Sequence, residues 1–241
     1  MRETLRGSAI LFAVFVGVTA GLSAQTGNSV FLPNEAGEWS IPQAHVGRTV
    51  TRDILVEMVG HGVFSVDPVG IETVRPEIIQ ANHFTVFDLL VKLDREDRID
   101  LESHDDDAMG THVIDSLHGE SGWWYQACYS AGWFERNTHR MDHFPVKSEG
   151  VVRFSIERAA WLSKLYRAFE QAMARIAEND GRVIVPRVRI EGPRRERIEF
   201  ENVAARAHDT RIDVLQPGTV TALDILLSPG EQSLLKGWSV T

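Results

Sequence analysis

Residues 85–93 read Thr-Val-Phe-Asp-Leu-Leu-Val-Lys-Leu, and this stretch predicts a helix. Its apolar side chains fall at positions 86, 89, 90 and 93, which is the three- and four-residue spacing of one helix face. Thr85 is a suitable N-cap, and Asp88 three residues later comes close to a capping box. We therefore expect a short amphipathic helix that begins at Thr85 and is wrapped by a mostly antiparallel sheet.

Strand-like segments flank this helix on both sides. Residues 54–59 form a short apolar run that ends in a glycine-containing turn. Residues 122–129 are dense in aromatic side chains, with residues 132–134 as the return arm of a hairpin. Residues 150–156 alternate apolar and polar positions from residue 152, as a half-buried strand does. These segments predict the strands of one domain.

An acidic stretch and a long helix complete the pattern. Residues 94–107 are rich in carboxylates and predict a solvated loop. Calcium binding there is the alternative, but the stretch lacks the spacing of a calcium-binding loop.

Aromatic and aliphatic residues recur at intervals of three and four residues over 157–179, and this spacing predicts a helix. Strand character returns in 183–190 and 197–200, around a turn at Gly192-Pro193.

The sequence pattern of the first predicted helix recurs near the end of the chain. Thr221-Ala-Leu-Asp-Ile-Leu226 repeats the pattern of Thr85-Val-Phe-Asp-Leu-Leu90, and each is preceded by a strand ending in glycine, Gly60 or Gly192. Either a domain duplication or shared helix-cap chemistry explains this. Fifteen residues follow Leu226, so a second copy is either shortened or cut.

The composition excludes several classes of partner. The chain has 241 residues, 43% of them hydrophobic, so it can form a packed core. It carries 34 acidic and 25 basic side chains, a formal charge of −9. This balance argues against nucleic acid and against anionic membrane surfaces as partners.

The first residues predict export. Arg2 and Arg6 precede an apolar run over 9–18, and small residues follow as far as Ala24. This order is typical of a secretory signal peptide cleaved after Ala20 or Ala24, and the run is too short to favour a membrane span. An uncleaved anchor is the alternative. The one cysteine of the sequence cannot form an internal disulfide, which suits a bacterial periplasmic or surface protein.

The order of predicted elements and motifs over residues 50–157 resembles that of a known family. A strand, a helix opening Thr-Val-Phe-Asp-Leu-Leu, the motif Gly122-Trp-Trp-Tyr125 and a final strand after Gly150 occur in that order. They are similar to the transcobalamin-like C-terminal domain, a small β-grasp-type domain of exported bacterial proteins. Gly150-Val151 stands where the family usually has Gly-Asp. The resemblance implies a rigid, non-catalytic binding module. In vitamin-carrying relatives a separate helical barrel holds most of the corrinoid, and only one long helix is predicted here.

The aromatic hairpin is the candidate contact site for a ligand or partner. Alternation along a strand sends Trp123 and Tyr125 to one face and Trp124 to the other, so one face is either a docking site or is covered by the helix at 157–179. The candidate contact residues are Trp123, Trp124, Tyr125, Tyr129, Trp133 and Phe134.

Metal binding and catalysis have weaker signals. Several histidines and carboxylates lie between residues 104 and 143, of which His139, His143 and Asp106 are weak metal candidates, but their spacing matches no metal motif. No nucleophile elbow, phosphate loop or dinucleotide fingerprint occurs. We expect no cofactor and no enzymatic activity.

We therefore predict an exported α+β protein with a β-grasp-like first domain. We expect a non-catalytic binding or assembly module of the periplasm or cell surface, with another envelope protein or a small ligand as its partner. The alternatives are a corrinoid or sugar carrier that uses the aromatic hairpin, and a metal-binding envelope protein. We expect membrane contact only through an uncleaved signal segment. The predicted parts are a signal peptide (1–24), a tether (25–48), the β-grasp-like domain (49–157), a connecting helix (158–180) and a second strand-rich domain, which is a partial repeat if the chain is duplicated (181–241).

Overall fold

The computed structural model describes residues 53–129, 133–146, 151–191 and 197–231. They fall into two compact units: residues 53–170 together with 211–217 form the first, and 171–210 together with 218–231 form the second. The predicted signal peptide and tether lie outside the described residues. The predicted α+β class is confirmed, because each unit contains a helix and an antiparallel strand pair.

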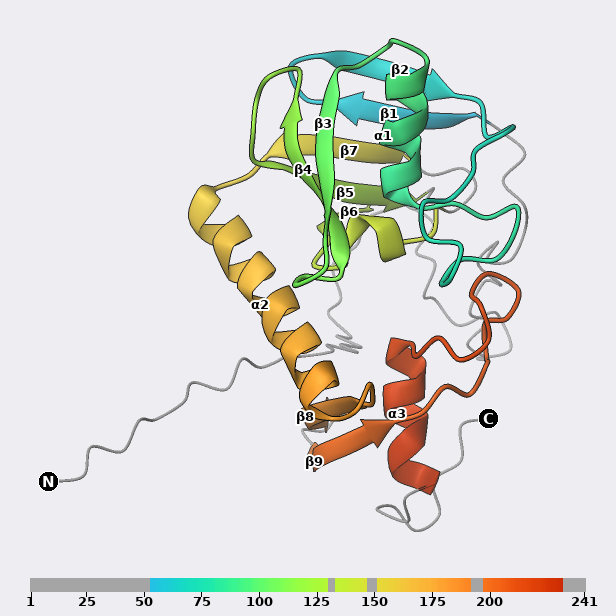
Figure 1. The fold of residues 1–241 in the computed structure, drawn as a ribbon, viewed down its shortest axis with the longest axis vertical. Helices are drawn as coiled ribbons and strands as arrows, with labels where there is room; N and C mark the ends of the chain where they lie inside the picture. The colour runs from blue at the N-terminus through green and yellow to red at the C-terminus, as the bar shows by residue number, and fades with distance from the viewer. Residues whose placement is uncertain (1–52, 130–132, 147–150, 192–196, 232–241) are drawn as a thin grey trace, which may run out of the picture. The chain divides into compact units, whose positions relative to one another are not determined.

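The first unit is built on a five-stranded sheet (Figure 1). The strand order is β2-β1-β7-β5-β6, and every neighbouring pair is antiparallel except β1 and β7, which are parallel. Gly60 in the turn between β1 and β2 and Gly62 at the start of β2 have φ angles of 91° and 123°, a region that favours glycine. The strands are β1 (Ile54–Met58), β2 (Gly62–Val66), β5 (Trp123–Tyr129), β6 (Trp133–Arg136) and β7 (Val151–Ile156).

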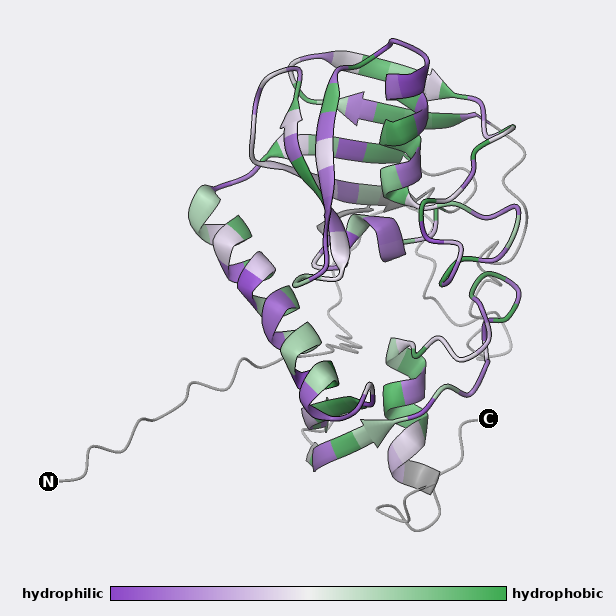
Figure 2. Ribbon diagram, in the orientation of Figure 1, coloured by the Kyte–Doolittle hydropathy of each residue, from purple (hydrophilic) through white to green (hydrophobic). Residues whose placement is uncertain are grey.

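The predicted helix forms as α1 (Val86–Arg95) and lies across one face of this sheet (Figure 1). The expected capping box is complete: the Thr85 backbone N–H and hydroxyl donate to one Asp88 oxygen at 2.6 and 2.7 Å, and the Asp88 N–H donates back to the Thr85 hydroxyl at 3.3 Å. Phe87 and Leu90 of α1 share a core with Trp123 and Tyr125 of β5. Hydrophobic and hydrophilic residues alternate along the strands beneath it (Figure 2).

The acidic stretch is partly a strand, so the prediction of a solvated loop is wrong for its second half. β3 (Leu101–Asp106) pairs antiparallel with β4 (Thr111–Leu117), with a register shift between Glu102 and Ser103. Four consecutive residues of β3, from Glu102 to Asp105, are exposed. A strand with polar side chains on both faces has no alternation to reveal it, and its pairing with β4 supplies the missing stabilisation.

The predicted long helix forms as α2 (Ala159–Glu178). Its N-terminal part belongs to the first unit and the part from Gln171 onward belongs to the second. In the second unit, β8 (Val183–Glu191) pairs antiparallel with β9 (Arg197–Ala205), and α3 (Ala222–Glu231) packs its Ile225 and Leu226 against their core. The expected turn at Gly192-Pro193 lies outside the described residues.

The cap of α3 repeats that of α1. The Thr221 N–H and hydroxyl both donate at 2.7 Å to one oxygen of Asp224, and the Asp224 N–H lies 3.4 Å from the Thr221 hydroxyl oxygen. The other oxygen of each carboxylate accepts a backbone N–H from the preceding connection, that of Val74 for Asp88 and that of His208 for Asp224. The two helices therefore share their capping box and its anchor to an earlier segment.

Candidate functional site

Three of the predicted contact residues belong to the core. Trp123, Trp124 and Tyr125 are 1%, 3% and 0% exposed, so none of them offers a ring to a ligand or partner, and the prediction of a docking surface there is wrong. Trp123 and Tyr125 pack beneath α1, as alternation along β5 requires. Their burial contributes to stability rather than to recognition.

Trp124 is covered by α2. Its ring centroid lies 6.0 Å from that of Trp161, 6.1 Å from Tyr166 and 6.3 Å from Phe169. Its indole N–H donates at 2.7 Å to the Asn137 carbonyl, which satisfies the buried polar group. The alternative stated from the sequence, that the long helix covers the second aromatic face, is therefore what occurs at Trp124.

The other three predicted contact residues are described only by their backbone. Tyr129 pairs with Trp133, and Phe134 pairs with Cys128, in the β5–β6 hairpin. Their side chains lie outside the described part of the structure. The hairpin is confirmed, and a contact role for these three side chains stays a prediction.

The weak metal candidates each have protein partners. Nδ1 of His143 lies 2.8 Å from an oxygen of Asp142, and Asp106 accepts the Met109 N–H at 2.9 Å in the β3–β4 turn. The ring of His139 lies against Phe144, with centroids 5.8 Å apart. In the ranges that the structure describes, no group of three or more His, Cys, Asp or Glu side chains is arranged to hold a metal ion.

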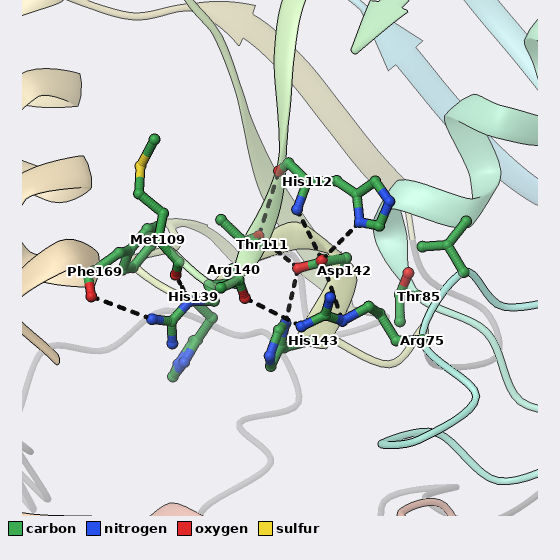
Figure 3. Close-up of polar contacts among 12 residues, drawn as sticks. Arg75, Thr85, Met109, Thr111, His112, His139, Arg140, Asp142, His143 and Phe169 are labelled. Atoms are coloured by element: carbon green, nitrogen blue, oxygen red, sulfur yellow. Dashed lines mark hydrogen bonds and ion pairs between the residues drawn. The ribbon is translucent and has the colours of Figure 1, made fainter. Parts of the chain in front are cut away.

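A different polar cluster is centred on Asp142, in the short 3-10 helix η1 (Met141–His143), and sequence reasoning missed it (Figure 3). The side chain of Asp142 is fully buried. Its Oδ1 accepts the Thr111 hydroxyl at 2.6 Å and Nδ1 of His143 at 2.8 Å. Its Oδ2 accepts the backbone N–H and Nδ1 of His112 at 2.9 and 3.0 Å, and Nε of Arg75 lies 3.5 Å away. A carboxylate accepts only, so each imidazole donates from Nδ1.

These donors decide the charge of Asp142. Burial alone would raise its pKa, but the hydrogen bonds from His112, His143 and Thr111, with the charge of His143, hold the pKa of Asp142 well below its usual range. The carboxylate therefore stays ionised at neutral pH and does not exchange a proton there. Its role is to join β4, η1 and the connection that carries Arg75.

A second arginine extends the cluster toward α2. Nε of Arg140 donates to the Met109 carbonyl at 2.9 Å, and its guanidinium carbon lies 4.7 Å from the centroid of the Phe169 ring. Arg140 thus connects the β3–β4 turn to the helix. In the described part of the chain, neither His112 nor His143 hydrogen bonds to a serine or cysteine side chain, so no activated nucleophile is assembled around these imidazoles.

Exposed apolar side chains lie on the face of the five-stranded sheet that points away from the core. Ile54, Val56 and Met58 of β1 point into the core, so Leu55 and the following Val59 point to the opposite face. Val63 of β2 lies diagonal to Leu55 on that face. We call Leu55, Val59 and Val63 the outer patch; their exposed fractions are 44%, 49% and 64%.

The outer patch surrounds an ion pair. Nε of Arg153 on β7 donates to a carboxylate oxygen of Glu57 at 2.8 Å, and both side chains are about one-third exposed. Glu57 is directly opposite Val63 across the β1–β2 pair and opposite Arg153 across the β1–β7 pair. The face thus combines apolar area with a charged centre, as protein-binding surfaces often do. The apolar run at 54–59 predicted the strand but not which of its residues are exposed.

Comparisons with family models, with curated proteins and with solved structures found no match to this chain. In the described residues, no helix is long and apolar enough to cross a membrane. The site therefore has to be interpreted from its own geometry.

Proposed function

We propose that this protein is an exported, non-catalytic binding or assembly module of the bacterial envelope. Its partner is another envelope protein, which it binds through the outer patch and the Glu57–Arg153 pair. The observation that carries this proposal is the exposure of three aliphatic side chains on one sheet face. Exposed apolar residues that gather on one face, around polar groups, favour a protein partner.

The chemistry of the remaining polar groups supports a non-catalytic role. Arg75, His112 and His143 surround the fully buried carboxylate of Asp142, and both of its oxygens accept hydrogen bonds from the chain itself. Such a group stabilises the fold and exchanges no proton near neutral pH. Of the two indoles that would line the pocket of a small-ligand carrier, Trp124 is buried, and the side chain of Trp133 lies outside the described part of the structure.

The topology supports the β-grasp-like assignment, which stays a proposal. A β1–β2 hairpin, a helix across one face and a last strand inserted parallel to β1 at the centre of the sheet are the features that this assignment requires. Kinship with the transcobalamin-like domain rests on the same order of elements, and corrinoid binding is not part of the proposal.

Export is a separate part of the proposal and has its own test. Expression of the full chain in a bacterium with a Sec pathway, followed by fractionation and mass measurement, is expected to give a periplasmic or surface form that begins after Ala20 or Ala24. A cytoplasmic form with an intact N-terminus would contradict it.

The binding role is tested with matched charge substitutions. Val63→Lys places an ammonium group in the outer patch, opposite Glu57, whereas Val69→Lys changes another exposed valine, 74% accessible, outside it. We expect both variants to keep the stability of the parent protein, and only Val63→Lys to lose the proteins that co-purify with the tagged parent from envelope extracts. Equal co-purification with both variants would refute binding through this face.

A further inference from the structure

The connections that precede α1 and α3 carry the same six-residue pattern. Residues 75–80 read Arg-Pro-Glu-Ile-Ile-Gln, and residues 211–216 read Arg-Ile-Asp-Val-Leu-Gln. Each segment begins at the same distance before its capping threonine, Arg75 before Thr85 and Arg211 before Thr221. Five of the six positions hold the same or a chemically similar side chain, so the resemblance between the two connections is not limited to helix-cap chemistry.

The two segments also fold alike. The Arg75 carbonyl accepts the N–H groups of Ile78 and Ile79 at 3.0 and 2.9 Å, and the Arg211 carbonyl accepts those of Val214 and Leu215 at 3.0 and 2.8 Å.

The charged side chains match as well. Nε of Arg75 lies 3.0 Å from a carboxylate oxygen of Glu77, and Nε of Arg211 lies 2.9 Å from one of Asp213. Each segment therefore forms one backbone turn, and an ion pair between its own arginine and its own acidic residue spans that turn.

The two segments pair with each other, and the pairing is reciprocal. Residues 211–217 are part of the first unit, where Ile79 and Leu215 form an antiparallel bridge. The Gln80 N–H donates to the Val214 carbonyl at 2.9 Å, and the Gln216 N–H donates to the Ile78 carbonyl at 2.7 Å. Exchanging the equivalent residues of the two segments converts each of these bonds into the other.

The glutamine side chains repeat this reciprocity. Nε2 of Gln80 donates to the Leu215 carbonyl at 3.3 Å, and Nε2 of Gln216 donates to the Ile79 carbonyl at 3.2 Å and to that of Pro76 at 3.1 Å. Ile79 is 1% exposed and Val214 is 4% exposed, so each segment also buries an apolar side chain. An interface in which residue i meets j and j meets i is the signature of two-fold association between like elements.

We propose that residues 75–80 and 211–216 are the two sides of a homotypic docking element, and that the partner of each is another copy of the same element. Within one chain the two segments are matched to each other. When the internal partner is removed, the freed segment 75–80 pairs with segment 75–80 of a second copy of this chain. This proposal is independent of the outer patch.

A segment exchange tests the homotypic character while the protein stays folded. Residues 75–80 are replaced by Arg-Ile-Asp-Val-Leu-Gln, and residues 211–216 are replaced by Arg-Pro-Glu-Ile-Ile-Gln. A symmetric contact tolerates this exchange, so hydrogen exchange of the amides of residues 80 and 216 is expected to stay within about threefold of the parent rates. Loss of protection at these two amides, with the amides of α1 still protected, would overturn the proposal.

A proline that weakens the internal contact tests pairing between chains. Gln216→Pro deletes the N–H that donates to Ile78 and the side-chain amide that donates to Ile79. We expect this variant to sediment as a dimer, and the double variant with Gln80→Pro as a monomer. A folded Gln216→Pro variant that remains monomeric at all concentrations, or a dimer that survives the second substitution, would overturn pairing through this element.

Discussion

Asp88 and Asp224 hold equivalent positions at the starts of α1 and α3, and each is 1% exposed. One oxygen of each carboxylate accepts both the N–H and the hydroxyl of the threonine three residues earlier. The other oxygen accepts a backbone N–H from the connection before the helix. Each aspartate therefore fixes both the start of a helix and the path of the chain that leads to it.

The first prediction concerns Asp88. Asp88→Asn leaves only one oxygen to serve three donors, so a buried N–H or hydroxyl loses its acceptor. The free energy of unfolding is expected to fall by about 1–3 kcal/mol, which urea titration of the whole chain measures. Asp107→Asn, at an exposed position in the β3–β4 turn, is the control and should change stability by less than about 0.5 kcal/mol. Equal effects of the two substitutions would contradict this role.

The second prediction is a pH dependence that arises from Asp142. Its folded-state pKa lies below its unfolded-state value, so its contribution to stability is complete above about pH 4 and is lost as the pH falls further. Unfolding free energies of the parent should therefore decrease from pH 5 to pH 2 more steeply than those of Asp142→Asn. At pH 7 the variant should be less stable by about 3 kcal/mol, because Arg75 and both histidines lose an anionic partner.

Chemical denaturation of both proteins at several pH values shows whether the pKa of Asp142 is lower in the folded chain than in the unfolded chain. Parallel curves for the parent and Asp142→Asn across the acid range would mean that this carboxylate has the same pKa in the folded and unfolded chain. That result would mean that protonation of Asp142 does not contribute to the loss of stability in acid.

The third prediction concerns the packing of α2 on β5. Trp124→Phe keeps most of the ring but leaves the Asn137 carbonyl without its donor, so we expect a loss of about 1–2 kcal/mol. Trp124→Ala also opens a cavity beside Phe169 and should cost about 3–5 kcal/mol. Faster hydrogen exchange in residues 161–169 of α2 should accompany the larger loss. An unchanged exchange rate there would show that the helix does not depend on Trp124.

Local signals in the sequence predicted much of the first unit. The Thr85–Asp88 cap, the alternation from residue 152 to 156 and the aromatic hairpin each depend on a few neighbouring residues, and the corresponding elements form. β3 was missed because its exposed carboxylates have no apolar partners along the strand, and its order comes from β4, which is a neighbour only after folding.

The site was less predictable because its parts meet only in three dimensions. Asp142, Thr111 and Arg75 come from three separate segments, and none of them lies in a recognisable motif. The sequence leaves two roles open for the aromatic residues, a contact surface or part of the core, because it does not say whether α2 returns to cover Trp124. The 54–59 run was identified as a strand, but the exposure of Leu55 depends on which face α1 covers.

Site-specific photocrosslinking in intact cells tests binding through the outer patch most directly. A photoreactive p-benzoylphenylalanine is placed at position 63 in one strain and at position 69 in another, both exposed valines in the parent chain. We predict a discrete light-dependent adduct with another envelope protein from position 63 and none from position 69. No adduct from position 63, or the same adducts from both positions, would contradict binding through this face.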